Sequence, residues 1–73
     1  MNDQKFSPDY RFQLRSQIAA AGFRTITEFS KAVGVDVSRI SRIVSGWEYP
    51  SPKLARAMAD ALSITPKELK ELL

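Results

Sequence analysis

The stretch GVDVSRISRIVSG, residues 34–46, begins and ends with glycine and combines valine and isoleucine with serine and arginine. On a helical wheel of about 100° per residue, its side chains separate into two sides. The apolar side holds Val37, Ile40, Ile43 and Val44, and the polar side holds Ser38, Arg39, Ser41, Arg42 and Ser45. The stretch therefore predicts one short amphipathic helix, residues 37–45, between two glycines.

The polar side of this predicted helix carries no acid. Solvated helix faces usually mix acids and bases that support each other three or four residues apart. Hydroxyls and guanidiniums alone are instead donors for phosphates and DNA base edges, and a helix is narrow enough to enter the major groove. By themselves Arg39 and Arg42 also fit an ordinary solvated face, so the wider sequence has to decide between the two interpretations.

Residues that can cap a helix N-terminus mark four further helices. Ser, Thr and Asp accept backbone N–H groups that the first turn leaves unpaired. Three of the caps are followed by proline, which fits the first helical position, and two are followed three residues later by a glutamate that completes a capping box. The predicted caps are Ser7, Thr25, Asp36, Ser51 and Thr65, and the predicted helices are residues 8–20, 26–33, 37–45, 52–62 and 66–72.

Every periodic stretch of the chain has helical spacing. Apolar residues recur three or four apart, as Leu14 and Ile18 do, and no stretch shows the sustained alternation or the turn dipeptides of a β-hairpin. The sequence predicts an all-α fold with one domain, residues 8–73, after a flexible N-terminal arm, residues 1–7. Because the chain has no cysteine, helix packing has to stabilise the domain, and dimerisation would add to that.

Composition argues against several classes of function. The chain has no histidine and no cysteine, and it lacks a glycine-rich phosphate loop, so we expect no enzyme activity, no metal and no cofactor. No apolar run approaches the ~18 residues of a membrane span, and residues 1–12 lack the apolar region of a secretory signal, so a cytoplasmic protein is expected. The net charge of +3 is compatible with a nucleic-acid partner without requiring one.

Residues 25–65, TITEFSKAVGVDVSRISRIVSGWEYPSPKLARAMADALSIT, resemble the Cro and lambda-repressor-like (XRE-type) helix-turn-helix family. The resemblance implies a compact five-helix domain whose second helix crosses the DNA backbone and whose third lies in the major groove. It also implies a homodimer on double-stranded DNA with two-fold-related half-sites. The residues that carry the resemblance are Thr25, Phe29, Ser30, Gly34, Val35, Ile40, Ser41, Ile43, Gly46, Pro50 and the Ala-Leu pair of the fourth helix.

The resemblance also assigns roles to individual positions. Arg42 is the best candidate for a base contact, because arginine can bond bidentately to guanine. Val37, at the edge of the polar side, can touch a thymine methyl group or join the core. The start of the second helix can offer backbone N–H groups to a phosphate. The predicted base contacts are Val37, Ser38 and Arg42, and the predicted phosphate contacts are Ile26, Thr27, Lys31, Arg39 and Ser45.

The segment GWEYP, residues 46–50, departs from the family pattern, which often has a basic residue directly after the glycine. This weakens one expected phosphate contact. We expect Trp47 and Tyr49 to cap the core, with a phosphate bond or a partner subunit as alternatives. Residues 25–50 are formally neutral, so other basic residues have to supply further phosphate contacts. The candidates are Arg11, Arg15, Arg24, Lys53 and Arg56, although Arg11 and Arg15 have the spacing of ordinary surface residues.

Two functions remain open at this point. One is a transcriptional repressor that occupies an operator and excludes polymerase. The other is an antitoxin-type module that binds and neutralises a toxin partner and regulates its own synthesis, since such proteins share the fold. Trp47, Tyr49 or the C-terminal leucines would then bury into that partner. Leu73 is also a candidate for a dimer contact.

Overall fold

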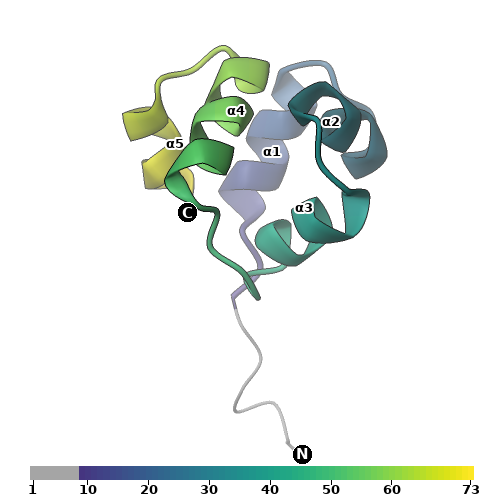
Figure 1. Cartoon of the computed structure of the whole chain (residues 1–73), viewed down its shortest axis with the longest axis horizontal. Helices are drawn as coiled ribbons and strands as arrows, with labels where there is room; N and C mark the ends of the chain where they lie inside the picture. Colours follow the sequence, from purple (N-terminus) through teal and green to yellow (C-terminus); the bar gives the residue numbers. More distant parts are fainter. Residues whose placement is uncertain (1–8) are drawn as a thin grey trace, which may run out of the picture.

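The computed structural model describes residues 9–73, which form five helices and no strand (Figure 1). This confirms the predicted all-α fold. The expected N-terminal arm, residues 1–7, lies outside the described residues. The helices are α1 (Phe12–Ala20), α2 (Ile26–Val33), α3 (Val37–Val44), α4 (Pro52–Leu62) and α5 (Pro66–Leu72).

Four of the five helices begin where their cap residues predict. In each, a side-chain oxygen of the preceding residue accepts a backbone N–H of the first turn, so the cap satisfies a donor that the helix itself cannot. The Thr65 box is complete, whereas Glu28 accepts the N–H of Arg24 instead of closing the box on Thr25. The four caps are Thr25, Asp36, Ser51 and Thr65.

Helix α1 begins at Phe12, so the predicted start at residue 8 is wrong. The predicted cap at residues 7–8 lies outside the described residues, but residues 9–11 are not helical. The backbone N–H of Arg11 donates to the carbonyl of Val44 at 2.8 Å. Because that donor is bonded to the end of α3, it cannot join the first turn of a longer α1, and a tertiary contact overrides the local signal.

A left-handed glycine ends α2 and allows the turn into α3. Gly34 has φ +90°, and its N–H donates to the carbonyl of Ser30 at 2.8 Å. A Cβ at this position would meet no atom within 4 Å. The requirement for glycine therefore comes from the backbone dihedral and not from crowding.

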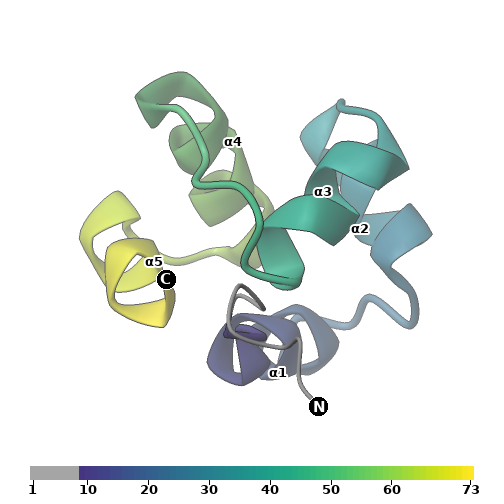
Figure 2. The ribbon, with the colours of Figure 1, turned by 90° about the horizontal axis from the view of Figure 1, so that it is seen from below.

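The core lies where all five helices meet. Helix α2 packs on α3 and α4, α1 packs on α3 and α5, and α4 packs on α5. Figure 2 shows α2 and α3 together on one side of the molecule and α5 on the opposite side. The ring of Phe29 is fully buried and meets Phe23 edge-on at 5.3 Å between centroids. The other buried apolar residues are Leu14, Ile18, Ile40, Ile43, Val44, Leu54, Met58, Ala59, Leu62 and Leu69.

Candidate nucleic-acid interface

Helix α3 has one side in the core and one side open to solvent. Ile40 and Ile43 are fully buried, so they hold the helix against α1 and α2. The solvent side contains most of the predicted DNA-contacting residues of α3, with Ser38 and Arg42 exposed. Val37 is 39% exposed and lies at the boundary, outside the core cluster. The sequence left Val37 between core and solvent, and the structure keeps it at that boundary.

A single acid joins the two arginines of α3. Glu48 accepts a hydrogen bond from Arg39 Nε at 2.8 Å and from Arg42 Nε at 3.1 Å, one on each carboxylate oxygen. The Glu48 side chain is 26% exposed, whereas Arg42 is 54% exposed. The Arg42 hydrogen bond, together with Arg39 and the charge of both arginines, holds the pKa of Glu48 below its ordinary value, against the opposing effect of partial burial.

Glu48 therefore changes how the arginines are presented. A guanidinium has five N–H donors, and each arginine uses its Nε–H on Glu48. Bidentate contact with a guanine edge needs two parallel donors, which the two terminal nitrogens can supply. In the sequence, Glu48 stood out only because it lies in a segment where the family often has a basic residue. Its contacts span nine and six residues across the end of α3, a separation that helical spacing does not reveal.

A second acid is bonded at the start of α3. The carboxylate of Asp36 accepts the backbone N–H of Ser38 at 3.1 Å and also the Ser38 hydroxyl. The bond from the Ser38 hydroxyl is the largest cause that lowers the pKa of Asp36, and the bond from the Ser38 backbone N–H lowers it further. The hydroxyl hydrogen of Ser38 is thus occupied, and the lone pairs of this oxygen remain to accept a donor such as the amino group of a base.

The predicted phosphate contacts of α2 lie apart from the hydrogen-bonded residues on the polar side of α3. Ile26 is half-buried, while Thr27 and Lys31 are exposed. The N–H groups of the first two helical residues, Ile26 and Thr27, have no partner within the helix itself. Within residues 9–73, no hydrogen bond or ion pair joins these three residues to the polar side of α3. The packing of α2 on α3 therefore sets where these three residues lie relative to the polar side of α3.

Arg11 has a structural role that its sequence pattern did not indicate. Its guanidinium donates to the carbonyls of Ile43 and of Glu48, the latter at 2.7 Å, and its Nε donates to Leu73 at 3.4 Å. These contacts tie the end of α3, the following loop and the C-terminus together. The prediction that Arg11 is an ordinary surface residue is therefore wrong. The partners lie 32, 37 and 62 residues away, so no local pattern points to them.

The aromatic residues of the loop after α3 do not cap the core, contrary to prediction. Trp47 is 65% exposed and Tyr49 is 57% exposed. The backbone of the loop folds onto the end of α3, where the Trp47 N–H donates to the Arg42 carbonyl at 2.9 Å. Pro50 is the buried residue of the loop, and the Arg11 guanidinium lies 5.7 Å from the Tyr49 ring centroid. Pro50, and neither of the two rings, is therefore the buried side chain of this loop.

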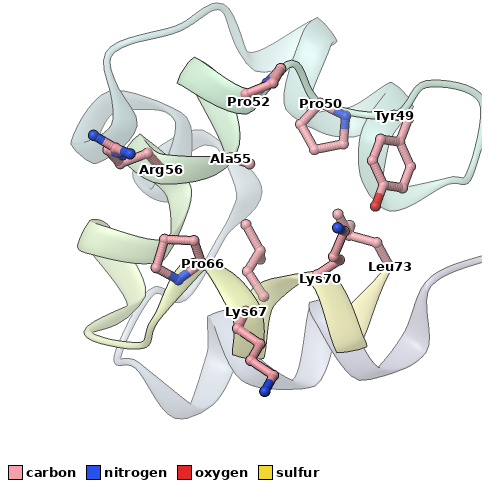
Figure 3. Close-up of a pocket in the computed structure, with 10 residues that line it drawn as sticks. Tyr49, Pro50, Pro52, Ala55, Arg56, Pro66, Lys67, Lys70 and Leu73 are labelled. Carbon is pink, nitrogen blue, oxygen red and sulfur yellow. The ribbon is translucent and has the colours of Figure 1, made fainter.

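A second surface feature lies between α4 and α5. A groove of about 540 Å³ has Pro50, Ala55 and Leu69 among its lining residues. Three cations also line it, Arg56 on α4 and Lys67 and Lys70 on α5, and no acid does. Figure 3 shows Arg56 on one side of the groove and Tyr49 and Leu73 on the other.

A family model described as helix-turn-helix matches residues 24–69. The chain belongs to the helix-turn-helix family, of the Cro/cI-like XRE type. As a helix-turn-helix protein it is a transcription regulator that binds double-stranded DNA, and the family is not an enzyme family. Comparison with curated proteins finds no match. None of the helices in residues 9–73 has the length and apolar character that a membrane crossing requires.

Proposed function

We propose that the protein is a repressor that recognises a specific operator through the solvent side of α3. The observation that carries this proposal is the fixed orientation of α3, whose Ile40 and Ile43 are fully buried while Arg42 stays exposed. Preorganised side chains lose less entropy on binding. The proposed base contacts are Val37, Ser38 and Arg42, and the proposed phosphate contacts are Ile26, Thr27, Lys31, Arg39 and Ser45.

Repression then needs no second activity. A protein bound across an operator excludes polymerase by occupying the same DNA. We further propose that two copies bind together, because helix-turn-helix proteins commonly use two-fold symmetry to read half-sites about one helical turn apart. Sedimentation of the protein with and without its operator tests this, and a 1:1 complex with an asymmetric site would contradict it.

The decisive experiment is operator selection followed by mutation. An operator selected from random DNA is measured with wild type and with Arg42→Ala. The variant is expected to lose about 1–3 kcal/mol, or roughly 5- to 150-fold in Kd, at a guanine-containing site. Lys70→Ala on α5 is the matched control, because it removes one exposed cation away from α3. Equal losses in the two variants, or no loss with Arg42→Ala, would contradict the proposed recognition surface.

A second candidate function, the antitoxin-type binding of a protein partner, has its own observation. Trp47 and Tyr49 are exposed, and Tyr49 borders the groove between α4 and α5. A two-fold dimer through this groove would bring each cation-lined patch against an identical patch. The repulsion between like charges favours an acidic protein segment with an apolar anchor over a second copy.

Selection from a displayed peptide library tests this second candidate. Acidic peptides with an apolar residue are expected to be enriched, and Lys67→Glu is expected to weaken their binding. A set of selected peptides without acids, or binding that Lys67→Glu leaves unchanged, would argue against a partner in the groove.

A further inference from the structure

Glu48 is held in place from both of its ends. Its backbone carbonyl accepts a hydrogen bond from Arg11 at 2.7 Å, and its carboxylate bonds Arg39 and Arg42. Gly46, with φ +90°, turns the chain after α3 so that Glu48 comes back beside the last turns of that helix. The acid is therefore a fixed part of the surface that the arginines present.

Charge is the first property that Glu48 changes on this surface. Arg39 and Arg42 carry two positive charges, and the bridging carboxylate reduces their sum to one. A DNA phosphate that approaches either guanidinium also meets this carboxylate, so the arginines attract phosphates less strongly. A guanine edge presents neutral acceptors, O6 and N7, and is opposed less by the carboxylate.

Orientation is the second property. A free arginine side chain loses about 2 kcal/mol of rotamer entropy when it is fixed in one geometry. Because Glu48 already bonds the Nε–H of Arg42, part of this ordering is complete before DNA arrives. The bond leaves the terminal nitrogens for the two parallel hydrogen bonds that guanine accepts.

We propose that Glu48 is a specificity-determining residue, which lowers the affinity of α3 for DNA in general and directs Arg42 toward guanine. This inference rests on the proposed binding of α3 in the major groove. Glu48 acts as a positioning residue through Arg39 and Arg42, and it makes the ratio of operator binding to random-DNA binding larger than the arginines alone would make it.

The test compares wild type with Glu48→Gln, which keeps the shape of the side chain and removes its charge. Binding to the selected operator and to random DNA is measured over a salt series. Glu48→Gln is expected to bind random DNA more tightly, to lower the specificity ratio, and to steepen the slope of log affinity against log salt by about one. Between 50 and 200 mM salt (roughly a fourfold change), that slope adds about 3- to 4-fold to the loss of affinity.

A second variant separates charge from orientation. Glu48→Asp keeps the negative charge but shortens the side chain, so it cannot bridge both arginines in the same geometry. Its salt slope is expected to match wild type, while its preference for guanine over other bases at the Arg42 position is expected to fall. Thermal unfolding of both variants checks that the fold is retained.

The proposed function and the proposed role of Glu48 would be contradicted by different results. If wild type shows no preference for any selected sequence, the proposed function fails and this inference fails with it. If wild type binds an operator specifically but Glu48→Gln has the same salt slope and specificity ratio, the role of Glu48 alone is overturned. A Glu48→Gln variant that loses operator and random binding equally would also overturn it, because that pattern indicates a structural role.

Discussion

The two sides of α3 share one helical backbone but differ in what holds their side chains in place. On the core side, Ile40 and Ile43 are fully buried and contribute to stability through packing. On the solvent side, Arg39 and Arg42 are held by one surface acid, and ion pairs at this level of exposure contribute little to stability. The difference teaches that the solvent-side residues of α3 can be changed at little cost in stability, whereas changes to its core residues cost much more.

The largest expected effect is on the core side. Ile40→Ala removes a fully buried side chain and is expected to lower the free energy of unfolding by about 2–5 kcal/mol. In a domain of this size that is a large share of the total stability. Denaturant unfolding followed by circular dichroism measures it. Val37→Ala, at the 39% exposed boundary position, is the matched control and should cost less than about 1 kcal/mol. Similar losses at the two positions would contradict the conclusion that the core side of α3 contributes more to stability than its solvent side.

Arg11 links the two sides, so it gives the next largest effect. Arg11→Ala leaves the carbonyls of Ile43 and Glu48 without this donor, and a loss of about 1–3 kcal/mol in unfolding free energy is expected. The loop that carries Glu48 should loosen as well, so the specificity ratio for DNA should fall together with stability. Arg24→Ala, an exposed arginine in the turn before α2, is the control. If the stability of Arg11→Ala equals that of the control, the network around Arg11 does not stabilise the fold.

The smallest effect comes from pH and concerns the solvent side alone. The pKa of Glu48 in the folded protein lies below its ordinary value near 4.5. A depressed carboxyl pKa stabilises the fold fully above the ordinary value, and the contribution disappears as pH falls through the lowered folded-state value. The stability difference between wild type and Glu48→Gln should therefore shrink when pH falls below about 4.5. Unfolding curves at pH 7 and at pH 3 measure this stability difference. A difference that grows on acidification would contradict a stabilising ion pair between Glu48 and the two arginines.

Much of the architecture was predictable because its causes are local. Thr25, Ser51 and Thr65 each bond an N–H three residues away, so their short sequence patterns contain both partners of the interaction. Helix α2 ends at Gly34 for an equally local reason, the positive φ angle. The helix-turn-helix resemblance of residues 25–65 is confirmed by the family match over residues 24–69. The individual DNA contacts assigned from that resemblance stay predictions.

The parts that could not be predicted depend on long-range partners. The start of α1 is set by a bond from Arg11 to Val44, and the exposure of Trp47 follows from how the loop folds onto the end of α3. Glu48 looked like a lost phosphate contact in the sequence, but in the fold it bridges two arginines that were assigned to DNA.

The sequence by itself determined that α3 is an amphipathic helix between two glycines, with an apolar side and a side of serines and arginines. Helical periodicity and capping act within a few residues, so the chain contains all the information they require. Only the tertiary structure decided how the arginines are presented. The positions of Glu48 and Arg11 depend on bonds that form when distant segments pack together, and those bonds set the charge and orientation of the solvent side of α3.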